Sequence, residues 1–390
     1  MRDWKTMRQQ LLRSVVLLTV LSSGAVLGVA VYFAERGVET LSQSVIEQTT
    51  ERTELTLERF FRPIEQELRA LQAWGERGML ELDDPAGFLQ LVQPFLESQR
   101  ENAGLELTRE DGAEIFILVE SESAYALRSI ASDNPTRARW TRFKRGRAVE
   151  SWTETTRYNA RTRPWFKGAL GLESESGMFW TEPYTFFTTR LPGITAATRF
   201  RRGGKRFVVG VDLSLINISR FTTNLQVSDH GAVAVLTESG QTIGLPRSDR
   251  FSDPETLRDS MLKPVEVIGV PFLRGAIDAA RELDGTKAAY RFQHDGGEWW
   301  GGTREYALSA ERPLLIQAAV PESDLVGDLN QQRNLILLII AASLLVAIGI
   351  SYALGRRYEA KIEIAMSRAK QLGQYTLEKR IGSGGMGSVY

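Results

Sequence analysis

The chain has 390 residues, of which 43% are hydrophobic and 25% charged, a composition that excludes a largely disordered or fibrous protein. The 48 basic side chains balance the 48 acidic ones, so we expect no nucleic-acid partner. Because the chain has no cysteine and only 2 histidines, it forms no disulfide, and we expect no metal site.

Two apolar runs predict membrane-spanning helices at residues 15–34 and 335–354. Each run has about 20 residues without a charge, which is the length that a helix needs to cross a bilayer. Basic residues outnumber acidic ones in 1–14 and in 355–390, on the outer flank of each run. The positive-inside rule therefore places both termini in the cytoplasm and residues 35–334 on the other side of the membrane.

Each run also has an alternative interpretation. The first run could be a cleaved signal peptide with a small-residue site near Gly28 and Ala30, although it ends in Tyr32 and Phe33, which suit a membrane interface. The second run could be a buried core helix, although it is apolar on every face and two arginines follow it at once.

Residues 35–75 predict a long helix after the first run. Proline at position 63 predicts a kink in it. Apolar residues at steps of four and three form a stripe along this helix. The stripe either packs on the chain's own domain or forms the seam of a homodimer. Its members are Leu57, Phe61, Ile64, Leu68 and Leu71.

Beyond this helix the pattern changes to short strands separated by turn signals. We expect an α+β fold with two small modules in series, 76–221 and 222–330, each built on an antiparallel sheet. Arg201-Arg202-Gly203-Gly204 predicts the turn of a hairpin. The predicted strands are Glu114–Glu120, Ile194–Phe200, Arg206–Asp212, Ala232–Thr237, Gln241–Gly244, Ala288–Gln293, Glu298–Tyr306 and Leu314–Val320, and Ser323–Asn330 should be helical.

One segment of the first module is similar to a known family. The sequence YNARTRPWFKGA at 158–169 is followed by WTEPY at 180–184 and GVDLSL at 210–215. This combination resembles the double-Cache extracellular sensors, in which two tandem PAS-like modules lie between two transmembrane helices. The resemblance implies that the membrane-distal module binds a small extracellular ligand, such as an amino acid, an amine or a carboxylate.

The resemblance also implies a set of ligand-binding residues. Arg163 offers a planar fork for a carboxylate, and Asp212 could accept hydrogen bonds from an ammonium group. Phe166 stands where the family usually has tyrosine, which removes one hydrogen-bond donor. The implied ligand-binding residues are Tyr158, Arg163, Trp165, Tyr184 and Asp212.

These residues also have a purely structural interpretation. Trp165 and Phe166 could be core residues, and Arg163 could form an internal ion pair with Asp212. The two histidines, His230 and His294, lie beside turn residues and are predicted to be on the surface. The pair Trp299-Trp300 is predicted to fill the core of the second module or to lie at the edge of its sheet.

The C-terminal part predicts a juxtamembrane helix at 355–373 and a glycine-rich loop within 374–390. The flanking residues favour two strands, and strand–glycine loop–strand is the hairpin that covers the nucleotide phosphates in protein kinases. YTLEKRIGSGGMGSVY at 375–390 resembles the start of bacterial eukaryotic-like serine/threonine kinases; a flexible glycine-serine linker is the alternative. The resemblance implies nucleotide contacts at Ile381, Gly382, Gly384, Gly385, Gly387 and Val389.

Together these features indicate a two-pass sensor of the bacterial plasma membrane, with a homodimer as the expected assembly. ATP and Mg²⁺ would serve a kinase domain whose lysine strand and catalytic aspartates would follow residue 390, so residues 1–390 carry no catalytic residue. The alternatives are a binding protein without catalysis, or a sensor with a chemoreceptor, histidine-kinase or cyclase output.

Overall fold

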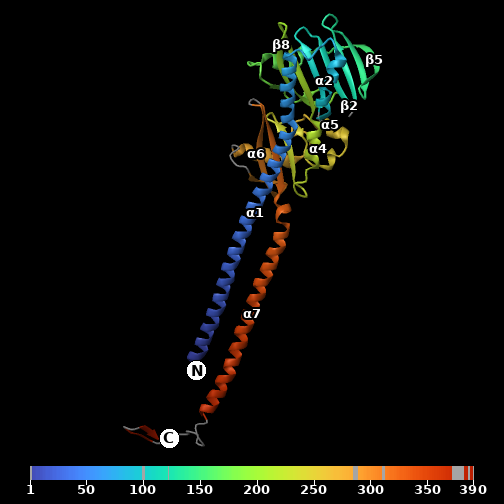
Figure 1. The fold of residues 1–390 in the computed structure, drawn as a ribbon. Helices are drawn as coiled ribbons and strands as arrows, with labels where there is room; N and C mark the ends of the chain where they lie inside the picture. The colour runs from blue at the N-terminus through green and yellow to red at the C-terminus, as the bar shows by residue number, and fades with distance from the viewer. Residues whose placement is uncertain are drawn as a thin grey trace. The chain divides into compact units, whose positions relative to one another are not determined.

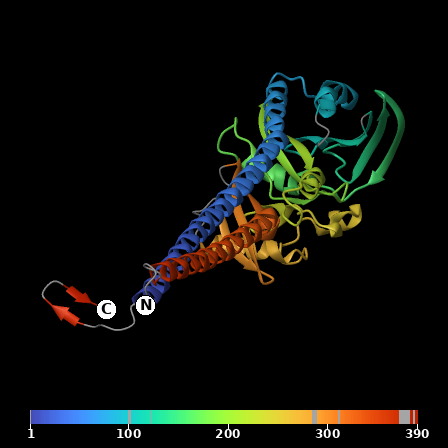
Figure 2. The same ribbon diagram turned by 90° about the horizontal axis from the view of Figure 1, so that it is seen from below.

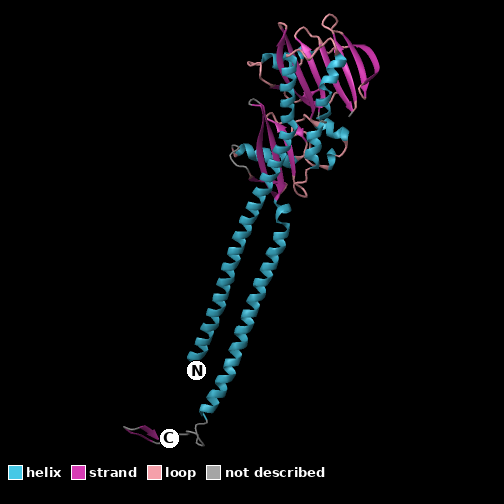
Figure 3. Cartoon of the chain, viewed as in Figure 1, coloured by secondary structure: helices cyan, strands magenta, loops and turns pink. Residues whose placement is uncertain are grey.

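The computed structural model describes residues 2–98, 102–121, 123–283, 289–309, 312–370, 382–384 and 387–389. The chain divides into two compact units. One unit is Thr40–Leu325, and the other takes in the described parts of Met1–Glu39 and Val326–Tyr390. Within the first unit the strands form two separate groups (Figure 3).

The first unit contains the C-terminal part of a long helix, α1 (Arg2–Glu76), which continues through Pro63. All five residues of the predicted apolar stripe are buried, with at most 2% of their surface exposed. They pack in one core with a second helix, α2 (Pro85–Ser98), and with both sheets (Figure 1). The stripe therefore packs on its own chain, and the alternative of a dimer seam along it is wrong.

The first sheet has nine antiparallel strands and corresponds to the predicted 76–221 module. Its order is β5-β4-β3-β2-β1-β9-β8-β6, with β7 also paired to β8. Figure 2 shows β4 and β5 curving away at one free edge of this sheet. The strands are β1 (Asn102–Arg109), β2 (Glu114–Ser121), β3 (Ala124–Ile130), β4 (Arg137–Lys144), β5 (Arg147–Thr155), β6 (Phe179–Trp180), β7 (Tyr184–Thr185), β8 (Pro192–Arg202) and β9 (Lys205–Ser214).

The two faces of this sheet pack against different elements. Because side chains alternate along a strand, Leu105 and Leu107 lie on the face that joins the core with α1 and α2. The other face is covered by a short 3₁₀ turn, η1 (Ala160–Thr162), and by a helix, α3 (Pro164–Gly171). A separate core of aromatic and small residues, including Trp140 and Phe166, lies on this second face.

The second sheet has five antiparallel strands in the order β11-β10-β14-β13-β12. Its strands are β10 (Ala232–Thr237), β11 (Thr242–Gly244), β12 (Tyr290–His294), β13 (Gly297–Ser309) and β14 (Arg312–Pro321). The helical elements are α4 (Ile216–Asn224), η2 (Asp249–Phe251), α5 (Pro254–Ser260) and α6 (Pro271–Glu282).

Most predicted strands are confirmed within a few residues. Gly203 and Gly204 both have positive φ in the β8–β9 turn, which explains why glycine occupies both positions. The strands β1, β3, β4, β5, β6 and β7 are not predicted by the sequence. Position 288 of the predicted Ala288–Gln293 strand lies outside the described residues.

The predicted surface position is confirmed for one histidine only. His230 is largely exposed. His294 is half-buried, because its ring lies edge-on to Phe272 and Trp299. Trp300 is buried in the second sheet and Trp299 is partly covered, so the tryptophan pair is mainly a core feature.

In the other unit, one helix among the described residues is long and apolar enough to cross a membrane. This is α1 from Leu17 onward, whose most apolar window has a mean hydropathy of 2.0 and is not buried within the protein. The last helix, α7 (Glu322–Lys370), begins as predicted near Ser323 and contains a shorter apolar stretch, Leu335–Ile350. The second membrane span therefore stays a prediction.

The described part of the glycine-rich segment is a two-stranded antiparallel pair, β15 (Gly382–Gly384) and β16 (Gly387–Val389). Positions 371–381, 385, 386 and 390 lie outside the described residues, so the predicted nucleotide contacts Ile381 and Gly385 lie outside them as well.

Candidate functional site

A cavity lies on the second face of the nine-stranded sheet, and all five predicted ligand-binding residues line it. Tyr158, Arg163, Trp165, Tyr184 and Asp212 are joined there by Glu106, Phe116, Arg128 and the segment Phe186–Thr189. The cavity and its opening enclose about 350 Å³, but the centre of a water-sized sphere can move through only about 20 Å³ of it. That space holds about one water molecule, so a larger ligand requires the cavity to open.

The register of the sheet brings the polar residues of this face together. Glu106 pairs with Phe116 of β2, and Phe116 pairs with Arg128 of β3. On its other side Glu106 pairs with Gly210 of β9, two residues from Asp212. Because alternate residues share a face, Asp212 and Glu106 are diagonal neighbours above the same surface.

Local sequence determines the position of Arg163 and Trp165. Arg163 has an extended backbone between η1 and α3, where Pro164 begins the helix. The guanidinium of Arg163 lies over the ring of Tyr184, 5.3 Å from its centre. Trp165, in the first turn of α3, is 1% exposed and forms part of the cavity wall, whereas Phe166 packs in the core behind it.

A chain of hydrogen bonds leads from Tyr184 to Asp212. The hydroxyls of Tyr184 and Thr195 are 2.7 Å apart, and the Thr195 hydroxyl donates to Asp212 Oδ1. Burial raises the pKa of Asp212 to about 7, although the Thr195 hydrogen bond and the charges of Arg163 and Arg128 act against this. Asp212 therefore exchanges its proton near neutral pH.

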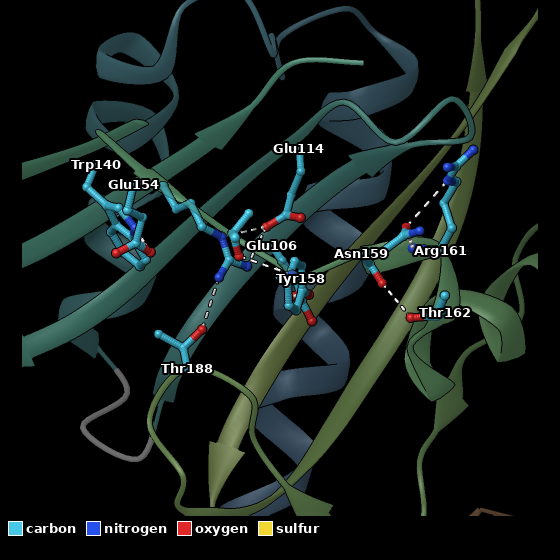
Figure 4. A network of polar contacts seen from close by, with 11 residues as sticks. Glu106, Glu114, Trp140, Glu154, Tyr158, Asn159, Arg161, Thr162 and Thr188 are labelled. Carbon is cyan, nitrogen blue, oxygen red and sulfur yellow. Dashed lines mark hydrogen bonds and ion pairs between the residues drawn. The ribbon is translucent and has the colours of Figure 1, made fainter. Parts of the chain in front are cut away.

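Arg128 lines the cavity and is held by a buried ion pair. Its Nη2 lies 2.7 Å from Glu114 Oε1, and its Nη1 donates to the Thr188 hydroxyl at 3.1 Å (Figure 4). The guanidinium also lies 3.9 Å from the ring centre of Tyr158. Burial raises the pKa of Glu114 in spite of Arg128, so the ion pair offsets only part of the desolvation cost.

Glu106 is a second buried acid in the cavity wall, and it has an incomplete set of partners. The Tyr158 hydroxyl donates to Glu106 Oε2 at 3.3 Å (Figure 4). Glu106 Oε1 is buried and has no hydrogen-bond partner among the described residues. Burial, together with the charges of Asp212 and Glu114, raises the pKa of Glu106 well above its ordinary value.

Arg163 and Asp212 line one cavity without forming the internal ion pair considered above. Among the described residues, the Arg163 side chain makes no hydrogen bond or ion pair, and its contact is the Tyr184 ring. Asp212 accepts its hydrogen bond from Thr195. Burial raises the pKa of Tyr158 and Tyr184, so both hydroxyls are neutral donors at physiological pH.

Sequence analysis missed Glu106, Glu114 and Arg128. Each is a charged residue inside an otherwise apolar strand: GLELT, EIFIL and YALRSI. A charged residue in such a strand is buried only when it is paired or functional, which is the signal that could have identified all three.

Comparison with known proteins gives neighbours among solved structures only. No family model matches the chain, and a search of curated proteins finds no match. The ligand-binding domain of Mlp24 with asparagine is 16% identical, with a TM-score of 0.46, and the match covers 76% of this chain and 99% of that one.

Two further neighbours are bacterial chemoreceptor domains. The ligand-binding domain of the Pseudomonas fluorescens chemoreceptor CtaA, in complex with L-isoleucine, is 18% identical, with a TM-score of 0.46 over 74% of this chain and 95% of that one. The ligand-binding domain of the Pseudomonas aeruginosa PAO1 amino-acid chemoreceptor PctC, in complex with GABA, is 13% identical, with a TM-score of 0.46. The match covers 71% of this chain and 99% of that one. Identities this low and TM-scores below 0.5 leave the ligand to be inferred from the cavity itself.

Proposed function

We propose that this protein is a membrane-anchored receptor that binds a small extracytoplasmic ligand with an ammonium and a carboxylate group. The observation that supports this most directly is that Arg163 and Asp212 line one cavity and do not pair with each other. Opposite charges held apart in one cavity suit a zwitterion, whose carboxylate would bind Arg163 and whose ammonium would bind Asp212.

The charge state of the cavity supports the same ligand class. Burial raises the pKa of Asp212 to about 7, which means that the carboxylate has too few favourable partners when the cavity holds no ligand. An ammonium group would supply that partner. The aromatic walls from Trp165, Tyr158 and Tyr184 would exclude water and strengthen both contacts.

Binding requires an opening of the cavity. The segment Phe186–Thr189 lines it, and β7 just before this segment pairs with β8 through only two residues. We propose that this segment moves to admit the ligand. Thr188 accepts a hydrogen bond from Arg128, which would hold the segment in the closed position.

The test is a binding screen on the full chain in lipid nanodiscs, by thermal shift and then by isothermal titration calorimetry. Amino acids, amines and carboxylates are compared. A hydrogen bond to a charged group contributes about 1.5–3 kcal/mol, so Arg163→Ala or Asp212→Asn should weaken binding about 10- to 150-fold.

Arg161→Ala is the matched control, because Arg161 is exposed, lies two residues before Arg163 and does not line the cavity. Its affinity should equal that of the wild type. The proposal is wrong if no ligand of these three classes stabilises the wild-type chain, or if Arg163→Ala and Arg161→Ala bind equally well.

We also propose the two-pass arrangement, with both termini in the cytoplasm. The length and apolarity of α1, the apolar stretch Leu335–Ile350 within α7, and the basic flanks of both runs support it. A homodimer remains part of this proposal, with a contact surface other than the buried stripe of α1.

A serine/threonine kinase is the proposed output, and ATP and Mg²⁺ would be its cofactors. The antiparallel register Gly382↔Val389 and Gly384↔Gly387 supports a glycine-rich hairpin. A chemoreceptor, histidine-kinase or cyclase output is the alternative. The reading frame after residue 390 separates them: a strand lysine about 15–20 residues further on and an HRD-type loop support the kinase, and their absence contradicts it.

A further inference from the structure

We propose that Glu106 makes the cavity selective for ligands with a second positive charge, such as basic amino acids. This inference rests on the proposed function and names the ligand class more narrowly. Asp212 would bind the first ammonium group, and Glu106 would accept hydrogen bonds from the second cationic group.

The charges around the cavity do not balance. Three acids, Glu106, Glu114 and Asp212, face two bases, Arg128 and Arg163. Arg128 forms hydrogen bonds to Glu114 at 2.7 and 3.2 Å, and both side chains are almost fully buried. Arg128 also acts on Glu106 and Asp212 through its charge, but among the described residues neither acid has a hydrogen bond or ion pair with an arginine.

A simple zwitterion would leave one acid without a counter-charge. Its carboxylate would bind Arg163 and its ammonium would bind Asp212, so Glu106 would still have no cationic partner. A second cationic group removes this deficit. Burial raises the pKa of Glu106 because an ionised carboxylate without a partner is costly to bury, and a cation beside it would favour the ionised form.

The unpartnered oxygen of Glu106 supports a ligand contact there. Glu106 is 2% exposed, lines the cavity, and has a hydrogen-bond donor at Oε2 only. Buried polar atoms without a partner are rare in folded proteins and need an explanation. Among the described residues, no group of three acidic or histidine side chains is arranged to hold a metal ion, so we favour an organic cation.

The backbone holds Glu106 in this position. Its neighbours Leu105 and Leu107 are fully buried on the opposite face, so the strand cannot turn over without exposing them. Gly210, which pairs with Glu106, leaves space for the side chain, because a Cβ at 210 would lie 3.2 Å from Glu106 Cγ and 3.3 Å from Oε1.

The two acids lie close enough for one small ligand to contact both. Glu106 and Asp212 are diagonal neighbours on adjacent strands, a relation that places such residues roughly 7–8 Å apart at Cα. A flexible chain of a few methylene groups between two cationic groups spans this range. Lysine and ornithine are therefore suitable probes.

The experiment compares isosteric ligand pairs by calorimetry on the full chain in nanodiscs. Lysine is compared with norleucine, and ornithine with norvaline, on the wild type, Glu106→Gln and Glu110→Gln. Glu110 is the matched control because it lies at the end of the same strand region, outside the cavity, and pairs with Arg206.

We expect the wild type and Glu110→Gln to bind each doubly cationic ligand about 10- to 100-fold more tightly than its isostere. In Glu106→Gln this ratio should fall to about one, while norleucine binds within about threefold of wild type. An unchanged ratio in Glu106→Gln, or a wild type that prefers norleucine, overturns the inference.

A second measurement on the wild type does not depend on the folding of a variant. Glu106 and Asp212 both have raised pKa values without ligand, so binding of a double cation should release more protons than binding of its isostere. Calorimetric titrations in buffers with different ionisation enthalpies give the number of protons released on binding. Equal proton release by lysine and norleucine contradicts the inference.

These outcomes also separate the inference from the proposed function. If Asp212→Asn abolishes binding of both lysine and norleucine while Glu106→Gln leaves their ratio unchanged, the receptor proposal stands and the role of Glu106 is wrong. If no ammonium-bearing ligand binds the wild type at all, both are wrong.

Discussion

Asp212 makes the stability of the ligand-free protein depend on pH. Burial raises its pKa to about 7 in the folded chain, against about 3.9 in an unfolded chain. Between these two values the folded state binds the extra proton, so the stability contributed by this group falls as the pH rises from about 4 to about 7. At neutral pH and above, the buried charge of Asp212 therefore lowers the stability of the fold, but it can bind a ligand.

The first prediction follows from this fall in stability with rising pH. Asp212→Asn should be more stable than the wild type at pH 8, and the difference in melting temperature should shrink toward zero near pH 4. Thermal unfolding of both chains across this range measures it. If Asp212→Asn melts earlier than the wild type at pH 8, Asp212 belongs to a stabilising ion pair instead.

The buried pair of Arg128 and Glu114 gives the second prediction. Arg128→Met leaves Glu114 buried without a counter-charge and should lower the free energy of unfolding by about 3–5 kcal/mol. Adding Glu114→Gln to the same chain should recover a large part of this loss. Urea unfolding of the two single variants and the double variant measures the coupling.

Arg142 provides the control for this cycle, because its ion pairs with Glu120 and Glu150 are partly exposed to solvent. Arg142→Met should change stability far less than Arg128→Met. Similar losses at both positions would mean that burial does not govern the cost of removing Arg128.

At the scale of elements, α1 is long and apolar enough to cross a membrane in its first part and is a core helix in its last part. Its stripe contacts both sheets: the ring centre of Phe61 lies 5.4 Å from that of Trp180 in the first sheet and 5.8 Å from that of Tyr306 in the second. Arg304 of β13 adds an ion pair to Glu54 of α1 at 2.8 Å. The helix therefore acts as a shared support for both modules.

The third prediction uses two leucines of this helix. Leu57 is 0% exposed and Leu55 is 48% exposed. Leu57→Ala should cost about 2–5 kcal/mol of unfolding free energy because it leaves a cavity, whereas Leu55→Ala should stay within about 0.5 kcal/mol of the wild type. Equal effects in denaturant titrations would show that the stripe does not pack on its own chain.

The start of α7 is attached to the second module through Asp324. Its Oδ2 accepts hydrogen bonds from the Ser228 hydroxyl at 2.7 Å and from the backbone N–H of His230 at 2.6 Å, and its Oδ1 lies 2.9 Å from His230 Nδ1. This hydrogen bond and the negative charge of Asp324 raise the pKa of His230. The contact is strongest when the imidazole is protonated, and it weakens as the pH rises through that pKa.

The fourth prediction is that Asp324→Asn lowers the pKa of His230 toward its ordinary value. Titration of the His230 ring signals by nuclear magnetic resonance, in the wild type and in the variant, measures the shift. Asp229→Asn is the control, because Asp229 contributes less to the shift than Asp324. A larger shift in Asp229→Asn than in Asp324→Asn would contradict this assignment.

At the scale of the whole molecule, an ion pair within Thr40–Leu325 joins a residue near the cavity to the strand that leads into α7. Glu182, two residues before Tyr184 of the cavity, forms an ion pair with Arg312 of β14. The strand β14 ends at Pro321, and α7 begins at the next residue. A ligand changes the arrangement of these elements only to the extent that it binds one arrangement more tightly than another.

The fifth prediction tests the membrane topology. A reporter that is active only in the cytoplasm should work when fused after residue 360 and fail when fused near residue 250, because the basic flanks retain both termini inside. A reporter that works only in the periplasm should show the opposite pattern. Activity of the cytoplasmic reporter at position 250 would overturn the proposed orientation.

Local features of the chain could be predicted from the sequence. The apolar run of the first helix, the stripe from Leu57 to Leu71, and the turn at Gly203-Gly204 depend on neighbouring residues only. Arg163 and Asp212 were named from a sequence resemblance, and they line the same cavity. The stripe and the turn could be predicted because periodicity and turn chemistry act over a few residues.

Only the tertiary structure decided what surrounds those residues. Glu106, Glu114 and Arg128 lie on three strands, and their meeting depends on the register β9–β1–β2–β3, which no local pattern reveals. The burial of His294 depends likewise on Phe272 and Trp299 from other elements. Strand register is set by the whole core, because a slip of one residue would move every apolar side chain to the wrong face.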